Sequence, residues 1–139
     1  MITNNNIGID EKLIYPELSY KIVGILFKIH GELGNKYQEK YYQRAIAIEL
    51  RRKNIEFEKE LMVDLVYEGE KIGKYFIDFL IENKIVLEIK ATDRFRISDF
   101  KQVEGYLKSK DIKLGILANF RTQRLTHTRV LNPNLIRKN

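Results

Sequence analysis

Residues 74–91, with the sequence KYFIDFLIENKIVLEIKA, decide the fold of this chain. Two runs rich in apolar residues, Lys74–Ile81 and Ile85–Ala91, flank the polar segment Glu82–Lys84. β-Branched and aromatic residues on both sides of a short polar turn are typical of two antiparallel strands. Charged residues interrupt both runs at positions where a buried strand favours apolar side chains.

These charged residues are Asp78 in the first run and Glu88 and Lys90 in the second. Side chains of a strand alternate between its two faces, so Glu88 and Lys90 share one face. A turn symmetric about Asn83 places Asp78, five residues before it, opposite Glu88, five residues after it. Two carboxylates opposed across a sheet repel each other, so this pairing is destabilising unless a positive charge compensates it.

Two sources of that positive charge fit the pattern. One is a divalent cation, Mg²⁺ or Mn²⁺; Mg²⁺ takes one or two carboxylates and leaves its other positions to water and phosphate. Lys90 would then orient or deprotonate a water and offset charge that develops on a phosphate. The other source is a structural ion pair between Lys90 and Glu88, with Asp78 pointing into solvent. The spacing alone leaves both interpretations open.

Outward from this hairpin, the hydrophobic period identifies the other elements. The predicted helices cover Pro16–Leu33, about Gln38–Lys53, and a segment with Ser98 as N-cap whose buried side is Phe100, Val103 and Leu107. The further predicted strands cover Ile55–Tyr67, Leu114–Phe120 and Leu125–Leu131, the last an edge strand closed by Pro133. The order ααβββαββ predicts an α/β fold, a mixed β-sheet flanked by helices, with parallel strands on either side of the third helix.

Length and composition predict one domain, because 139 residues correspond to a single typical unit. We expect short flexible termini at about residues 1–12 and 133–139. The chain has no cysteine, which excludes disulfides and thiolate metal sites. No apolar run approaches the roughly 20 residues needed to cross a bilayer, and the first ten residues do not resemble a signal peptide. These features favour a cytoplasmic protein without membrane contact.

The net charge of +6 is concentrated in the C-terminal part of the chain. Residues 1–90 contain 14 basic and 15 acidic residues, whereas residues 91–139 contain 11 basic and 4 acidic residues. Clustered basic charge favours a polyanionic partner such as nucleic acid. A solvated basic face would give the same composition.

Asp78, nine intervening residues and then Glu88-Ile89-Lys90, within the order αβββαβ, resemble the PD-(D/E)xK nuclease superfamily, which has a restriction-endonuclease-like core. Over about residues 15–131 the chain also resembles a small bacterial group, the GxxExxY proteins. His30-Gly31-Glu32-Leu33-Gly34 resembles their His-x-x-Leu-Gly segment, and Glu39-Lys40-Tyr41-Tyr42 resembles the Glu-x-x-Tyr part of their name motif. Lys36 stands where that motif has glycine.

The resemblance implies a metal-dependent active site. Asp78 and Glu88 would hold Mg²⁺ or Mn²⁺, with the Ile89 carbonyl as a further ligand, and Lys90 would serve the attacking water. Glu39 would reach the same site as an extra acidic group; without the resemblance it would be an ordinary surface carboxylate of a helix.

Gln102 and Tyr106 lie four residues apart on one helix face and resemble the Gln-x-x-x-Tyr motif of RecB-like nucleases. Gln102 would hold a water or the substrate backbone, and Tyr106 would stack on a base or contact phosphate. Their other interpretation is a half-buried polar pair. Among the basic residues, Arg121 and Arg124 are placed to bind a polyanion or to protect an edge strand by charge. His30 would contact phosphate or cap helix carbonyls.

The sequence thus predicts a metal-dependent nuclease that acts on nucleic acid, with DNA as the expected substrate. Two alternatives remain: a nucleic-acid-binding module that keeps the fold without turnover, and a structural or partner-binding protein. Phosphate-binding glycine loops, the Gly-x-Ser-x-Gly motif and paired-histidine zinc motifs are absent from the sequence. Oligomeric state and the strandedness of the substrate stay open.

Overall fold

The computed structural model describes residues 14–136. The predicted flexible N-terminus, about residues 1–12, and the last residues of the predicted C-terminal tail, 137–139, lie outside this range. Residues 133–136 were expected to belong to that tail, but they form the short helix α4 (Pro133–Ile136). The Asn132 side chain accepts a hydrogen bond from the Asn134 N–H at 2.9 Å, which orders the start of this turn.

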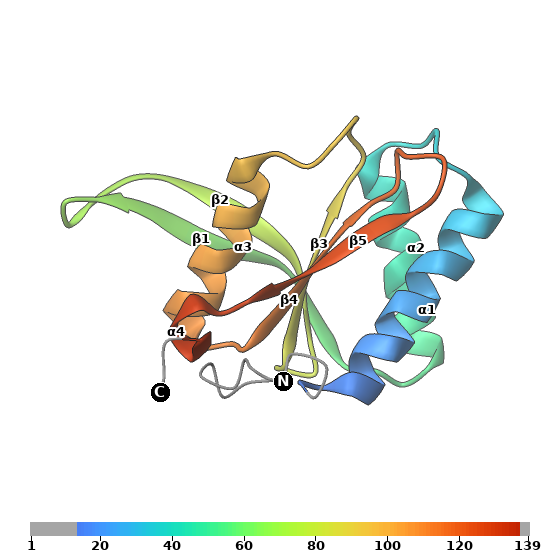
Figure 1. Ribbon diagram of the computed structural model, residues 1–139, viewed down its shortest axis with the longest axis horizontal. Helices are drawn as coiled ribbons and strands as arrows, with labels where there is room; N and C mark the ends of the chain where they lie inside the picture. Colours follow the sequence, from blue (N-terminus) through green and yellow to red (C-terminus); the bar gives the residue numbers. More distant parts are fainter. Residues whose placement is uncertain (1–13, 137–139) are drawn as a thin grey trace, which may run out of the picture.

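Five strands form one mixed sheet in the order β1-β2-β3-β4-β5 (Figure 1). The strands are β1 (Phe57–Tyr67), β2 (Glu70–Ile81), β3 (Ile85–Lys90), β4 (Leu114–Asn119) and β5 (Thr126–Leu131). The β3 and β4 strands are parallel, and every other neighbouring pair is antiparallel. The predicted α/β fold with a mixed sheet, and the parallel pair joined through the third helix, are confirmed.

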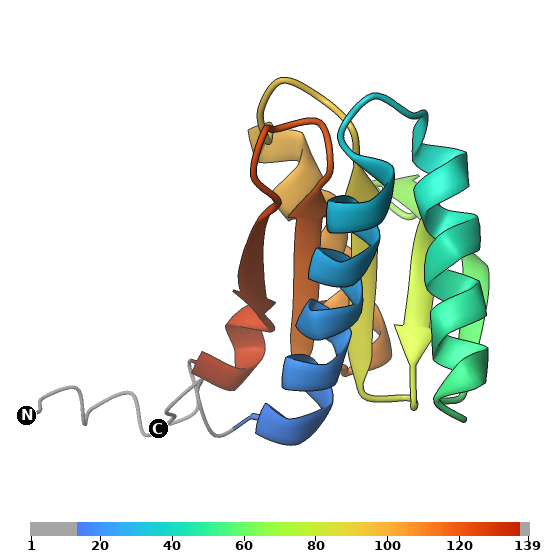
Figure 2. The same ribbon diagram turned by 90° about the vertical axis from the view of Figure 1, so that its right-hand side faces the viewer.

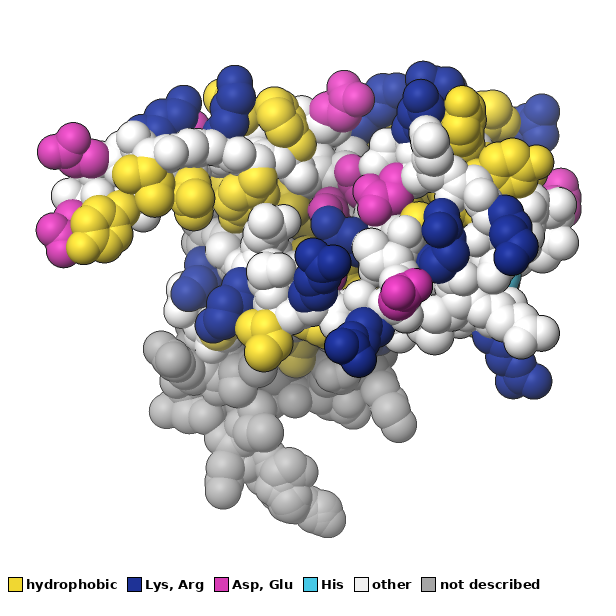
Figure 3. Space-filling model, turned by 90° about the horizontal axis from the view of Figure 1, so that it is seen from above, with side chains coloured by type: hydrophobic (Ala, Val, Ile, Leu, Met, Phe, Trp, Pro, Cys, Tyr) yellow, Lys and Arg dark blue, Asp and Glu magenta, His cyan; other side chains and the backbone are white. Residues whose placement is uncertain are grey.

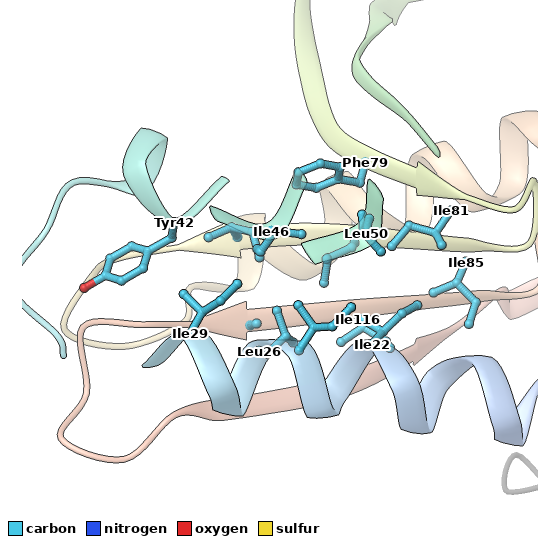
Figure 4. Close-up of a cluster of buried hydrophobic side chains, with 14 of the residues drawn as sticks. Ile22, Leu26, Ile29, Tyr42, Ile46, Leu50, Phe79, Ile81, Ile85 and Ile116 are labelled. Atoms are coloured by element: carbon cyan, nitrogen blue, oxygen red, sulfur yellow. The ribbon is translucent and has the colours of Figure 1, made fainter. Parts of the chain in front are cut away.

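Helices cover both faces of the sheet (Figure 2). One face carries α1 (Pro16–Leu33) and α2 (Glu39–Arg52), and the other carries α3 (Ile97–Lys110). The α1 stripe of Ile22, Ile25, Leu26 and Ile29 is at most 5% exposed, as its period of three and four predicts. Figure 4 shows this stripe meeting Tyr42, Ile46 and Leu50 of α2 and side chains of β2, β3 and β4.

A second, smaller core lies beneath α3. Val103 and Leu107 of this helix pack on Val86 and Leu117 of the sheet, and all four side chains are fully buried. Gly115 of β4 lets α3 approach closely, because a Cβ atom at this position would lie 2.7 Å from Val103 Cγ1. The two cores fix the two faces of β3, which carries Glu88 and Lys90.

The start of α3 differs from the sequence prediction. The N-cap is Arg96, not Ser98, and the helix begins at Ile97. Asp99 at the third helical position accepts a hydrogen bond from the Arg96 N–H at 2.8 Å, so an acidic side chain satisfies a backbone donor at this end. Ser98 is a good N-cap by residue type, but Asp99 takes the capping role from inside the helix.

The strand β2 is longer than predicted. The sequence places its start at Lys74, whereas it begins at Glu70 and pairs with β1 up to the turn at Glu68 and Gly69. The distal parts of β1 and β2 project from the body of the molecule as a two-stranded arm (Figure 1). Among residues 14–136, no helix is long and apolar enough to cross a membrane.

Candidate active site

Asp78 lies where the regular pairing of the sheet is interrupted. The β1–β2 register skips Asp78 and Glu60, and Glu60 has a left-handed backbone with φ 59°. On the other side of β2, the ladder with β3 ends at the pair Phe79–Leu87. Irregular positions in strands often redirect a side chain next to a functional site. Asp78 therefore has no register partner on either neighbouring strand.

At this interruption, two carboxylates accept hydrogen bonds from backbone N–H groups. Glu88 Oε1 accepts a hydrogen bond from the Asp78 N–H at 3.0 Å, and Asp78 Oδ2 accepts one from the Ile89 N–H at 2.7 Å. Each acidic side chain thus reaches the backbone of the other strand. The sequence places Asp78 and Glu88 opposite each other, and the structure brings their carboxylates together at this point.

Burial and mutual repulsion disfavour ionisation of both acids. Burial, with a smaller contribution from the nearby Glu39, raises the pKa of Asp78 to about 6, against the hydrogen bond from the Ile89 N–H. Burial and the charge of Asp78 raise the pKa of Glu88 to about 8. Glu88 is only 5% exposed. Because one carboxylate disfavours the charge of its neighbour, the pair is poised to accept a compensating cation.

Lys90 is the cation that the chain itself supplies here. Its Nζ lies 3.5 Å from Glu88 Oε2 and 3.6 Å from Asp99 Oδ1. Burial alone would lower the pKa of Lys90, but Glu88, Asp99, Glu39 and Asp78 together raise it. The ammonium group is therefore charged at neutral pH. Four acidic side chains lie near this one ammonium group. The negative charge that they can carry exceeds the single positive charge of Lys90, so the site can accept a further cation.

Glu39 reaches this site from α2, where it is the first helical residue. Its Oε2 accepts a hydrogen bond from the Ala91 N–H at 3.2 Å, directly after the end of β3. One turn later, Gln43 donates its side-chain N–H to Asp78 Oδ1 at 2.8 Å. The start of α2 thus closes one side of the group formed by Asp78, Glu88, Lys90 and Glu39, which we call the acidic centre.

Two adjoining pockets open on the α2 side of the acidic centre. The larger, of about 450 Å³, is lined by Gln38, Glu39, Lys40, Gln43, Ala91 and Arg121. The smaller, of about 110 Å³, is lined by Lys40, Gln43, Arg44, Lys59, Glu60, Asp78 and Phe79. Lys40 and Gln43 border both pockets, so the open surface near Arg121 continues to Asp78. Figure 3 looks onto this end of the molecule and shows acidic side chains in its middle with lysines and arginines around them.

The segment after β4 carries the predicted basic residues. His30 Nε2 lies 3.0 Å from the Thr122 carbonyl oxygen, so the side chain joins the end of α1 to this segment and does not cap its own helix. Arg121 Nη2 donates to the Tyr37 carbonyl at 2.9 Å, and Arg124 is exposed. The structure therefore brings Arg121 to the acidic centre, keeps Arg124 on the same segment, and gives His30 a contact that holds the segment in place.

Gln102 and Tyr106 belong to α3, which covers the face of the sheet that also carries Val86, Glu88 and Lys90. Gln102 borders a groove of about 400 Å³ between α3 and the β1–β2 arm, lined also by Val63, Leu65, Tyr75 and Lys101. Tyr106 is 2% exposed and belongs to the core beneath α3. A ring in that position cannot stack on a base, so the structure favours a packing role for Tyr106 over a contact with nucleic acid.

Sequence reasoning missed two residues of the acidic centre's surroundings, Gln43 and Asp99. Gln43 lies four residues after Glu39, so its position on the same helix face was available from the sequence. Asp99 is an acidic residue in the first turn of α3. Its contact with Lys90 depends on how α3 sits on the sheet, which no local pattern specifies.

Comparisons with known proteins bear on the family and the fold. The family model of the PD-(D/E)XK nuclease superfamily matches residues 16–130. The crystal structure of SSO0001 is similar in fold, with a TM-score of 0.52 and 23% sequence identity over 91% of this chain. The chain spans 63% of the length of that structure. No curated protein matches the sequence.

The matched residues 16–130 run from the first turn of α1 into β5 and so include the whole sheet up to its last strand and the acidic centre. This is most of the chain, and the matched range includes Asp78, Glu88 and Lys90. The chain therefore belongs to the PD-(D/E)XK nuclease superfamily.

Proposed function

We propose that this protein is a nuclease that hydrolyses phosphodiester bonds in nucleic acid, with Mg²⁺ or Mn²⁺ as cofactor and DNA as substrate. The observation that carries the proposal is the meeting of the Asp78 and Glu88 carboxylates across β2 and β3 with the Lys90 ammonium beside them. Membership of a nuclease superfamily supports the reaction class.

The acidic centre fits a divalent cation by the chemistry of its donors. Asp78 and Glu88 would hold the ion, and their repulsion would be relieved by it. The Ile89 carbonyl is a suitable further ligand, because its N–H points to Asp78 and the N–H and C=O of one strand residue point to the same side. Among residues 14–136, no three His, Cys, Asp or Glu side chains form a ready ligand group. Two carboxylates with a carbonyl, water and phosphate are a usual set for Mg²⁺.

When bound, a divalent cation supplies positive charge to a phosphate oxygen and acidity to a water. Lys90 would act beside it as an ammonium group, because its surrounding carboxylates keep it charged. There it would orient the attacking water and offset charge on the phosphate. Asp99 and Glu88 hold Lys90 in place, and Gln43 holds Asp78.

Arg121, Arg124 and His30 would serve the substrate. Arg121 borders the larger pocket beside Glu39 and is placed to contact phosphate. Arg124 extends the basic surface, and His30 contributes by fixing the backbone at Thr122. Gln102 is a candidate contact for nucleic acid on the α3 side of the sheet, at the groove next to the arm.

Within the superfamily, we propose that the chain is a member of the GxxExxY group. The Glu-x-x-Tyr part of the motif has a clear physical basis here. Glu39 binds the backbone after β3, and Tyr42 is fully buried, stacks on Phe120 with ring centroids 4.3 Å apart and donates its hydroxyl to the Gly34 carbonyl at 2.6 Å. The pair fixes the start of α2 against the acidic centre.

A second candidate function is nucleic-acid binding without turnover. The contacts of Lys90 with both Glu88 and Asp99 favour it, because they are also what a structural ion pair requires.

Incubation of end-labelled DNA and RNA with the purified protein separates the two functions. We expect DNA to be cut in Mg²⁺ or Mn²⁺ and to stay intact in chelator. Cleavage of RNA alone would contradict the DNA assignment. Binding without cleavage in either metal would contradict the nuclease and support the second candidate.

A further inference from the structure

Two tyrosines around the start of α2, Tyr37 and Tyr41, are about half exposed. Tyr37 is 47% exposed and Tyr41 is 43% exposed, with ring centroids 6.2 Å apart at an interplanar angle of 70°. Tyr42, in the same segment, is fully buried. Half-exposed rings beside a functional site are candidate contact surfaces, because aromatic side chains provide large contact area at low entropic cost.

Cationic side chains surround these rings. Lys40 Nζ lies 5.3 Å and Arg44 Cζ 5.6 Å from the centroid of the Tyr41 ring. Arg121 donates to the Tyr37 carbonyl, and its Nε is buried without a hydrogen-bond partner. Within residues 14–136, Lys40, Arg44 and Arg121 form no ion pair with a carboxylate. Their charges are therefore available to an anion.

The rings lie next to Lys40 and Arg121, two cations that border the pockets beside the acidic centre. Lys40 and Arg121 line the larger pocket together with Glu39, and Lys40 also lines the smaller pocket with Asp78. A ligand that touches Tyr37 and Tyr41 would thus lie along a continuous surface that leads to Asp78. Figure 3 shows basic and hydrophobic side chains side by side at the edge of this face.

We infer that Tyr37 and Tyr41, with Lys40, Arg44 and Arg121, form a stacking platform for unpaired bases, so that the substrate is single-stranded nucleic acid or an unpaired end. Flat rings bind the faces of bases, and the cations bind the phosphates between them. In a duplex those faces are already covered by neighbouring base pairs. The inference rests on the proposed function for its substrate, and it adds the strandedness that the acidic centre alone does not specify.

Binding in chelator tests the platform without any cleavage step. The probes are a fluorescent oligothymidylate, an oligouridylate of the same length and a blunt duplex, with affinity measured by anisotropy. Tyr41→Ala and Tyr37→Ala should each weaken binding of the single strands on the order of 5- to 100-fold, the contribution of one base stacked on an aromatic side chain. Tyr41→Phe keeps the ring and should bind like the parent.

Tyr20→Ala is the matched control, because Tyr20 is an 82% exposed tyrosine on α1. It should bind all probes as the parent does. Parental binding of both single strands by Tyr37→Ala and Tyr41→Ala would overturn the platform, as would an equal loss for the duplex. Weaker binding of oligothymidylate alone would support a platform for single-stranded DNA. Equally weakened binding of both single strands would support a platform that accepts DNA and RNA.

Failure of the platform and failure of the proposed function give different results. If the parent binds single strands through the tyrosines but cuts nothing in Mg²⁺ or Mn²⁺, the platform stands and the nuclease assignment fails. If the parent cuts DNA and neither tyrosine variant changes binding, the nuclease stands and the platform fails.

Discussion

Lys90 is the residue whose substitution best distinguishes a catalytic centre from a structural ion pair. Its side chain is 20% exposed and contacts carboxylates on β3 and α3. In a catalytic centre its charge acts on the substrate, whereas in a structural pair it stabilises the fold. The two roles predict different consequences when the charge is removed.

We expect Lys90→Met to reduce metal-dependent cleavage by roughly 100- to 1000-fold, the usual loss for one electrostatic group in an active site. Methionine keeps much of the apolar stem, so packing should survive. The melting temperature should change little, because the acids left behind can take up protons. A structural ion pair predicts instead a loss of roughly 3 to 5 kcal/mol in unfolding free energy. A large drop in melting temperature, or cleavage at the parental rate, would contradict the catalytic role.

At the level of single residues, the sequence was sufficient to place Asp78 opposite Glu88 and to put Lys90 on the same face as Glu88. It could do so because the turn is symmetric and side chains alternate along a strand. It could not predict that the β1–β2 register skips Asp78, because that skip accompanies the left-handed backbone of Glu60 on the neighbouring strand.

At the level of elements, α3 packs on β4, the strand next to β3, and this packing sets the distance between Asp99 of α3 and Lys90 of β3. Gly115 of β4 sets how closely α3 can approach the sheet. Gly115→Ala would place a methyl group 2.7 Å from Val103 Cγ1, so α3 must shift or a side chain must leave its rotamer. Such overpacking typically costs about 1–3 kcal/mol. Chemical denaturation should show this loss.

Gly24→Ala is the control for that substitution. Gly24 is exposed on α1, and a Cβ atom there has no neighbour within 4 Å. Alanine should therefore stabilise the protein by roughly 0.5–1 kcal/mol through the lower entropy of the unfolded chain. Equal effects of the two substitutions would contradict the close packing of α3 on β4.

The segment between β4 and β5 presents the basic residues beside the acidic centre. Reversal of Arg121 and Arg124 to glutamate should weaken nucleic-acid binding for all sequences and reduce the salt dependence by about two phosphate contacts. Reversal of Lys108 and Lys110, exposed at the far end of α3, serves as the control and should have a smaller effect. If the two double variants weakened binding equally, the segment between β4 and β5 would not be the binding surface.

Elements of regular period were predictable, whereas their ends were not. The apolar stripe of α1 and the residues Ile85, Leu87 and Ile89 of β3 are buried in the same core. The hydrophobic pattern of the sequence reflects this burial. The start of β2 at Glu70 and the N-cap at Arg96 depend on cross-strand pairing and on Asp99, where residue type alone is ambiguous.

At the level of the whole molecule, the buried acids link stability to pH. In the metal-free protein the pKa values of Asp78 and Glu88, about 6 and about 8, lie above the ordinary carboxyl values of about 4. Between these limits the folded state binds more protons than the unfolded state, so the free energy of unfolding falls as pH rises. The contribution is complete below about pH 4 and is lost as pH rises through about 6 and about 8.

Glu88→Gln tests this dependence, because glutamine cannot ionise. In chelator, the variant should unfold with a flatter pH profile than the parent and should be at least as stable in alkaline solution. Thermal melting of both proteins across this pH range provides the measurement. A parent whose stability rises with pH over the same range would contradict the strained acidic pair.

The central claim is that Asp78 belongs to a divalent-metal centre that cuts nucleic acid. Its most direct test is the rate of DNA cleavage as Mg²⁺ is titrated into chelator-treated protein, with the parent and Asp78→Asn compared on one substrate. We predict that the parent rate rises from background and saturates, while Asp78→Asn stays near background at the same Mg²⁺ concentrations. Cleavage by the parent in chelator, or the same Mg²⁺ dependence for both proteins, would contradict the account.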